Sequence, residues 1–157
     1  MNVPARTGLI EHYRSFLPVP LDANIIGLDE GNTPLVRLHT ISDSSRDIDV
    51  YAKCEGLNPT GSFKDRGMTV AVTIAASEGS KAIICASTGN TSASAAAYAA
   101  RGGLSAFVVI PEGKIALGKL AQAMMHGARV IQIEGNFDTG MSIVKSIADT
   151  TPVTLVN

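Results

Sequence analysis

A lysine at the start of a predicted helix could act as an amine nucleophile. It is Lys64, in the segment NPTGSFKDRG at residues 58–67, where a Pro-Thr-Gly turn comes first. Ser62, followed three residues later by Asp65, fits a capping box and predicts a helix that begins at Phe63. The positive end of the helix dipole disfavours the ammonium form there, as amine catalysis requires. A solvated surface lysine, neutralised by Asp65, is the alternative.

Hydroxyl side chains crowd a second segment, STGNTSAS, at residues 87–94. It directly follows the apolar run 82–86, which predicts a strand. In open parallel sheets, ligands bind beyond the carboxyl ends of strands, where the N–H groups of helix N-termini face the crevice. Gly89 would let a carboxylate or phosphate approach the backbone closely. A Ser/Thr-rich helix cap without any ligand would explain the same residues.

Two further lysines, Lys114 and Lys119, lie in the segment GKIALGK after Pro111. They are either solvated charges or groups that attract an anionic substrate. The sequence contains neither GxxxxGK[ST] nor GxGxxG, so a nucleotide P-loop and a dinucleotide-binding Rossmann domain are disfavoured. The three histidines are far apart and predict no metal site.

The elements that must position these segments alternate from about residue 50 onward. β-branched runs predict strands, and the stretches between them predict helices, in the order of βαβ units. The strands lack polar alternation, as expected where helices cover both faces. We therefore predict an α/β fold with an open, twisted, mostly parallel sheet and helices on both faces. The predicted strands are 50–54, 82–86, 106–110, 130–133 and 153–156, and the predicted helices are 63–77, 91–100, 116–126 and 137–149.

The first 49 residues fall outside this alternation. They predict a short helix within 8–16, a strand at 35–38 and a polar turn at 42–49. The last strand stops at Asn157 without a closing helix, which favours a chain that is part of something longer.

Composition narrows the class of protein further. The chain has 157 residues and a net charge of −1, which suits one domain without a nucleic-acid or anionic-membrane partner. No stretch reaches the roughly 20 apolar residues of a membrane-spanning helix, and the amino terminus does not resemble a secretory signal. Cys54 and Cys85 lie in apolar runs without CxxC spacing, which predicts reduced thiols in a cytoplasmic protein.

The two candidate segments together resemble the fold-type II pyridoxal-phosphate enzymes. NPTGSFKDRG is similar to their cofactor-lysine segment, and STGNTSAS is similar to their substrate-carboxylate loop. Within that superfamily the resemblance is to the threonine synthase family, and it runs from about residue 28 to the last residue. The segments that carry this narrower resemblance are EGNTPL (30–35), ASTGNTSASAAAYAA (86–100), GKIALGKLAQAMMHGA (113–128) and IEGNFD (133–138).

The resemblance implies a reaction and a set of roles. The family uses pyridoxal 5'-phosphate to convert O-phospho-L-homoserine and water to L-threonine and phosphate, by γ-elimination and then β-addition of water. Lys64 would form the internal Schiff base and move protons, and Asn90 would bind the ring hydroxyl oxygen of the cofactor. The substrate contacts would come from Ser87, Thr88 and Thr91 for the α-carboxylate and from Asn157 near the phosphate.

The resemblance also implies domains and a partner. Residues 1–50 would belong to a large domain, 51–152 would form a small βαβ domain, and 153–157 would begin the return to the large domain. The family's glycine-rich cofactor-phosphate loop, its partner for the pyridine nitrogen and an arginine for the substrate phosphate lie in a later segment. We therefore expect an amino-terminal part of a homodimeric enzyme, with weak cofactor binding, little turnover by itself and an exposed apolar patch.

Other functions stay open at this point. Another fold-type II enzyme, such as a threonine dehydratase or a cysteine synthase, would use the same lysine. A non-catalytic α/β module that binds a small anion would not need it.

Overall fold

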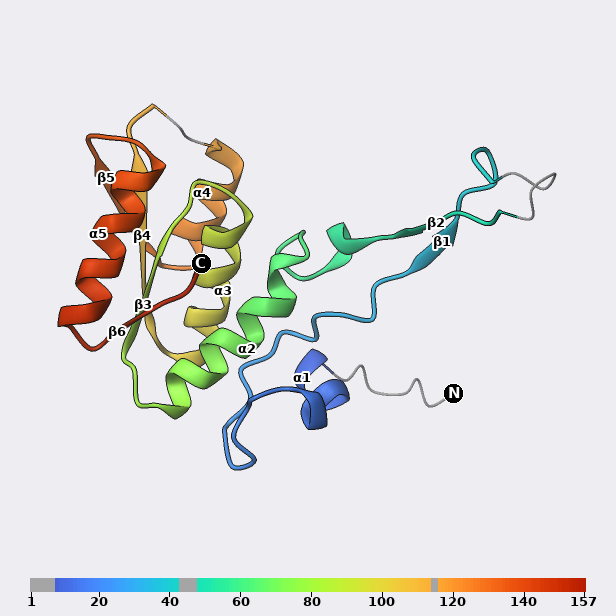
Figure 1. Cartoon of the computed structure of the whole chain (residues 1–157), viewed down its shortest axis with the longest axis horizontal. Helices are drawn as coiled ribbons and strands as arrows, with labels where there is room; N and C mark the ends of the chain where they lie inside the picture. Colours follow the sequence, from blue (N-terminus) through green and yellow to red (C-terminus); the bar gives the residue numbers. More distant parts are fainter. Residues whose placement is uncertain (1–7, 43–47, 114–115) are drawn as a thin grey trace.

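The computed structural model describes residues 8–42, 48–113 and 116–157 of the chain, which form an α/β structure. A four-stranded sheet with flanking helices makes up one end, and a two-stranded sheet extends away from it (Figure 1). The four strands are β3 (Ala82–Ala86), β4 (Ser105–Pro111), β5 (Arg129–Ile133) and β6 (Val153–Leu155). They are all parallel, which confirms the predicted fold class.

The order of the strands creates a switch point in the sheet. The order is β5-β4-β3-β6, so the chain builds outward from β3 to β5 and then crosses back to the other side of β3. Ala82 is aligned with Ser105 of β4 and with Val153 of β6, so the carboxyl ends of these strands meet at one edge. In sheets of this kind, ligands bind at that edge, beside the point where the strand order reverses. Here that point lies between β3 and β6.

Helices cover the two faces of the sheet separately (Figure 1). They are α2 (Lys64–Ser77), α3 (Asn90–Gly102), α4 (Leu117–Met125) and α5 (Phe137–Thr150). One face buries Cys85 together with Met68 of α2 and Tyr98 of α3, and α4 packs on that face beside α3. The other face buries Ile84 against Val144 of α5. Side chains of β3 therefore alternate between two apolar layers, which is why this strand is apolar throughout.

A buried acid joins the amino-terminal segment to the helical layer. Glu30 is only 1% exposed, and its carboxylate accepts hydrogen bonds from the N–H groups of Leu9 and Leu28, at 3.2 and 2.9 Å. Its third donor is the hydroxyl group of Tyr98, at 2.8 Å, on α3. The residues on either side of Glu30 in this turn, Asp29 and Gly31, have positive φ angles. These hydrogen bonds offset the free-energy cost of burying the carboxylate.

The prediction that residues 50–54 begin the parallel sheet is wrong. β2 (Tyr51–Lys53) instead pairs antiparallel with β1 (Leu35–Arg37), in the separate two-stranded sheet. No helix packs on this sheet among the described residues, and several large apolar side chains of the segment are exposed, such as Leu35 at 62% and Tyr51 at 49%. The alternation of apolar runs and helical stretches in the sequence could not distinguish this strand from those of the parallel sheet. The predicted polar turn at 42–49 lies mostly outside the described residues.

The amino-terminal helix lies at its predicted position, whereas the 3₁₀ turn after β2 was not predicted. α1 (Leu9–Tyr13) and a 3₁₀ turn, η1 (Arg14–Phe16), fill the predicted helix at 8–16, and a second 3₁₀ turn, η2 (Glu55–Leu57), follows β2. In the described part of the chain, no helix is both long and apolar enough to cross a membrane.

Candidate functional site

The amino-terminal ends of two helices lie together on one face of the sheet. Lys64 is the first residue of α2, and Asn90 is the first residue of α3. One residue further along α2, Asp65 accepts a hydrogen bond of 2.6 Å from the hydroxyl group of Ser94, one turn into α3. Because both helices cover the same face, the candidate lysine and the hydroxyl-rich loop share one side and one edge of the sheet.

The predicted capping box at this helix start is wrong. The helix begins at Lys64, whose N–H donates to Ser62 Oγ at 3.3 Å, but Asp65 does not return a bond to Ser62. The carboxylate of Asp65 is fully buried and accepts instead from the N–H of Thr60, at 2.7 Å, and from the hydroxyl groups of Thr60 and Ser94. These partners are buried, so Asp65 forms hydrogen bonds inside the fold and does not cap the helix.

Lys64 is half-buried beside β3. Its Nζ lies 5.9 Å from the centroid of the Phe63 ring. Burial raises the pKa of the Cys85 thiol to about 12, and the positive charge of Lys64 acts in the opposite direction. Cys85 is therefore an inert core thiol, and the amine of Lys64 lies within electrostatic reach of the last part of β3.

The loop after β3 leaves open space over its glycine. The N–H of Gly89 donates to Ser87 Oγ at 3.2 Å, and the hydroxyl of Ser92 donates to the carbonyl of Gly89 at 2.7 Å. A Cβ placed on Gly89 would meet no atom of the chain within 4 Å. Thr91 is 7% exposed, whereas Asn90 is exposed. The space directly above the backbone of Gly89 is therefore open.

Asn157 completes this edge from β6. Its Oδ1 accepts a hydrogen bond of 2.9 Å from the N–H of Ala86, the last residue of β3. The amide nitrogen of the Asn157 side chain is a donor and takes no part in this bond. The structure thus brings the candidate residues of the loop and Asn157 to the switch point between β3 and β6.

A cavity of about 430 Å³ opens at the same edge, on the side of α5. Of the predicted site residues only Thr88 lines it; Lys64 and Asn90 do not. The other lining residues were missed as site candidates, although each follows a predicted strand end, and that position was the available signal. They are Pro111, Glu112, Gly135, Asn136 and Phe137.

The lysines of the third segment have separate positions. Lys119 Nζ donates to the carbonyl of Thr60 at 2.8 Å, so it holds the turn that precedes Lys64. Lys114 lies outside the described residues.

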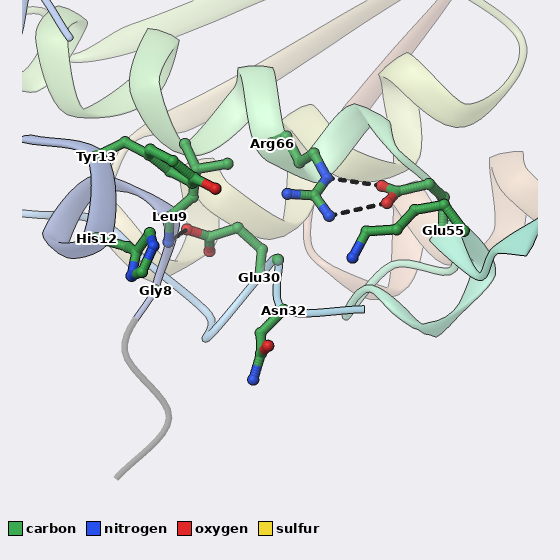
Figure 2. Close-up of a pocket in the computed structure, with 10 residues that line it drawn as sticks. Gly8, Leu9, His12, Tyr13, Glu30, Asn32, Glu55 and Arg66 are labelled. Carbon is green, nitrogen blue, oxygen red and sulfur yellow. Dashed lines mark hydrogen bonds and ion pairs between the residues drawn. The ribbon is translucent and has the colours of Figure 1, made fainter. Parts of the chain in front are cut away.

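A second cavity, of about 460 Å³, contains none of the predicted site residues (Figure 2). It lies between α1, residues 30–32, β2 and α2, and Arg66 and Glu55 line it. Figure 2 shows the guanidinium of Arg66 paired with the carboxylate of Glu55 through two hydrogen bonds, of 2.7 and 2.8 Å. The hydroxyl of Thr33 joins the pair, at 2.8 Å from Glu55 and 3.1 Å from Arg66. The polar groups satisfy one another, so this arrangement joins η2 and the segment at Thr33 to α2.

This ion pair predicts a loss of stability in acid. Hydrogen bonding to Arg66 lowers the pKa of Glu55 from 4.5 to about 2. A carboxyl group with a lowered pKa in the folded chain stabilises the fold above its unfolded pKa and loses that contribution as the pH falls through the folded value. The free energy of unfolding should therefore decrease between pH 4.5 and pH 2 on account of Glu55, by about 1–2 kcal/mol because solvent partly screens the ion pair.

Urea unfolding at a series of pH values measures this effect. Glu55→Gln should be less stable than the unaltered protein at pH 6, and the difference should shrink towards pH 2. The exposed Glu78 supplies the matched control, Glu78→Gln, whose difference should stay small throughout. Parallel curves for Glu55→Gln and the unaltered protein would contradict the prediction.

Comparison with known proteins identifies the family of the chain. Residues 26–157 match the protein family described as "Pyridoxal-phosphate dependent enzyme". The chain belongs to this family. Pyridoxal phosphate is the cofactor on which the family depends, and the amine of Lys64 with the open backbone at Gly89 fits one side of a site for it.

Members of the family with similar sequences are threonine synthases. The chain is 60% identical over 150 residues to the threonine synthase of Halalkalibacterium halodurans, which covers 96% of this chain and 42% of the relative. For the Synechocystis threonine synthase the identity is 57% over 151 residues, covering 96% of this chain and 40% of the relative. For that of Methanocaldococcus jannaschii it is 53% over 145 residues, covering 92% and 36%. The chain thus spans about two fifths of the length of these relatives.

Two solved structures share the fold. A crystal structure of O-ureido-L-serine synthase superposes with a TM-score of 0.72 at 27% identity, covering 84% of this chain and 43% of that one. The O-ureido-L-serine-bound mutant of that enzyme superposes with a TM-score of 0.70 at 25% identity, covering 84% and 42%.

Proposed function

We propose that the protein containing this chain is a threonine synthase, which forms L-threonine and phosphate from O-phospho-L-homoserine and water. Threonine synthases that are 53–60% identical over more than nine tenths of the chain support this function. The structural observation that carries it is the hydrogen bond between Asp65 and Ser94, because it keeps Lys64 and the loop at 87–91 on one side of the sheet edge.

Lys64 is the catalytic residue of this proposal. Its Nζ would hold the cofactor covalently and would accept and return protons at the carbon atoms of the substrate. Bound pyridoxal phosphate supplies an electron sink for the carbanions that such reactions require. The amide of Asn90 would donate to the ring hydroxyl oxygen of the cofactor. Both residues stand at helix starts, where the backbone fixes their position.

The loop and β6 hold the two anionic ends of the substrate. The hydroxyl groups of Ser87, Thr88 and Thr91 donate to the α-carboxylate, together with N–H groups at the start of α3. Asn157 donates its amide N–H to the substrate phosphate. The contact of its Oδ1 with the N–H of Ala86 supports this role, since it uses the amide oxygen and leaves the amide nitrogen as a donor for another partner.

We extend the proposal to organisation and location. We propose residues 1–50 as part of a second, larger domain, 51–152 as the small domain and 153–157 as the exit towards the larger one. Within that last stretch, residues 153–155 still pair with β3 and the N–H of Val156 donates to Ile84, so the chain leaves the sheet at its last residue. We also propose a homodimer with no nucleic-acid or membrane partner, and a cytoplasmic location, in agreement with the free thiols of Cys54 and Cys85.

Trapping of the cofactor tests the role of Lys64. The protein is incubated with pyridoxal phosphate, reduced with borohydride, digested and analysed by mass spectrometry. We expect the phosphopyridoxyl group on Lys64 and little on Lys53 or Lys119, whose amines donate to backbone carbonyls. A label spread evenly over the lysines would favour a non-catalytic anion-binding module.

Two product assays then separate threonine synthase from other enzymes of the family. We expect the protein to release phosphate from O-phospho-L-homoserine and to form threonine in equal amount. Release of ammonia from threonine without phosphate release would indicate a threonine dehydratase, and formation of cysteine from an activated serine and sulfide would indicate a cysteine synthase.

A further inference from the structure

The buried carboxylate of Asp65 contacts neither substrate nor cofactor in the reaction proposed above, yet it lies next to the reactive lysine in the sequence. Asp65 is 0% exposed and accepts three hydrogen bonds, two from Thr60 and one from Ser94. Burying a carboxylate in the interior is costly, and here neutral donors rather than a cation offset the cost. A buried carboxylate that binds only neutral donors has a structural role, which depends on the segments that its hydrogen bonds connect.

The carboxylate connects three segments around Lys64. Thr60 belongs to the turn that leads into α2, and Ser94 lies one turn after Asn90 in α3. The carbonyl of Thr60 also accepts from Lys119 Nζ at 2.8 Å and from Gln122 Nε2 at 3.3 Å, so α4 closes on the same turn. The helix end that carries Lys64 is therefore attached to α3 through Asp65 and to α4 through Thr60.

We propose that Asp65 is a positioning residue, whose hydrogen bonds to Thr60 and Ser94 hold the amine of Lys64 against the loop at 87–91. This inference rests on the proposed role of Lys64. In the absence of these bonds, α2 can turn or shift relative to α3, and the amine loses its place beside the loop. Displacements of about 1 Å in such groups lower rates by up to about a hundredfold.

Hydrogen-bond capacity separates a positional role of Asp65 from an electrostatic one. In Asp65→Asn, the amide oxygen can accept from the N–H of Thr60, and the amide nitrogen can donate to the hydroxyl groups of Thr60 and Ser94. Hydroxyl groups both donate and accept, so the three contacts survive although the charge is gone. Asp65→Ala removes all of them. A positional role therefore predicts that asparagine restores what alanine loses.

The experiment measures the initial rate at which borohydride traps limiting pyridoxal phosphate on Lys64. We expect Asp65→Ala to lower this rate about tenfold and Ser94→Ala about threefold, with Asp65→Asn within about twofold of the unaltered protein. The matched control is Thr73→Val, which removes a buried hydroxyl of the same helix that accepts from the N–H of Ile26 at 3.0 Å. It should lower the melting temperature without slowing the trapping.

Trapping in Asp65→Ala at the rate of Thr73→Val would overturn the proposal. So would trapping in Asp65→Asn as slow as in Asp65→Ala, because the charge would then be the cause. If Asp65→Ala does not fold, Ser94→Ala tests the proposal instead, because it removes only a single hydroxyl group. An unchanged trapping rate in Ser94→Ala would then contradict the proposal.

A cofactor-free measurement distinguishes failure of the positioning role from failure of the proposed function. Limiting acetic anhydride labels Lys64 in competition with the exposed Lys145 of α5. Loss of the hydrogen bonds should free the half-buried amine and raise its relative labelling about threefold in Asp65→Ala and Ser94→Ala, but not in Thr73→Val. If the unaltered protein is not trapped at Lys64, the proposed function fails, and unchanged labelling in both variants overturns the positioning role separately.

Discussion

Lys64→Ala is expected to abolish cofactor attachment and to lower threonine formation by on the order of a thousandfold or more. Lys64 is the first residue of α2 and lies within electrostatic reach of β3, whereas the nearby amine of Lys119 is bound to the carbonyl of Thr60. The fold should tolerate the change. Lys64 is only half-buried, and the contact of its amine with the Phe63 ring contributes about 1 kcal/mol or less.

Absorbance of the bound cofactor, threonine formation and urea unfolding measure the three parts of this prediction. Lys64→Arg keeps the positive charge but offers no deprotonated amine, so it should be as inactive as the alanine variant. The control is Lys145→Ala, which removes an exposed amine of α5 and should retain full activity. Retention of even a tenth of the activity in Lys64→Arg would contradict the proposed catalytic role of the Lys64 amine.

Glu30→Ala is expected to destabilise the fold by about 3–5 kcal/mol. The substitution leaves the N–H groups of Leu9 and Leu28 and the hydroxyl of Tyr98 without their shared acceptor. Burial, together with the charge of Glu30, raises the pKa of Tyr98 above its ordinary value, so the phenol stays protonated and remains a donor. Unpaired buried donors and the space left by the side chain both lower the free energy of unfolding.

Urea unfolding of a short variant series checks this expectation. Tyr98→Phe removes only one of the three donors and should cost about 1–3 kcal/mol. Glu134→Ala, at an exposed glutamate, should change the free energy of unfolding by less than about 0.5 kcal/mol. A cost for Glu30→Ala no larger than for Glu134→Ala would mean that the buried carboxylate does not stabilise the attachment of the amino-terminal segment.

Local sequence was sufficient for most of the parallel unit. Residues 82–86 form β3 as predicted, because a strand with neighbours on both sides and helices on both faces is a continuous apolar run. The run at 106–110 became β4 at 105–111, with one further residue at each end. The same pattern failed at residues 50–54. An apolar run indicates that a strand forms, but it does not indicate the neighbour with which that strand pairs. For this reason β2 was assigned to the wrong sheet.

The capping prediction at Ser62 and Asp65 failed for a related reason. Their spacing is correct for a box, but Thr60 and Ser94 offer Asp65 buried donors, and Ser94 is 29 residues away in the chain. In the same way, Glu30 and Tyr98 are separated by 68 residues, and no local pattern links them. A buried polar group takes the donors that the packed fold presents, wherever they lie in the sequence.

The chain's own residues determined where strands and helices form and which short segments carry the chemistry, because periodicity, turn residues and the types of side chain act over a few neighbouring positions. Tertiary structure alone decided the pairing of β2 with β1, the meeting of the Lys64 turn with α3, the place of Asn157 beside Ala86 and the cavity behind Thr88. Those features depend on contacts between residues that are far apart in the sequence. Such contacts form only in the folded chain, where the order of the strands brings these residues together.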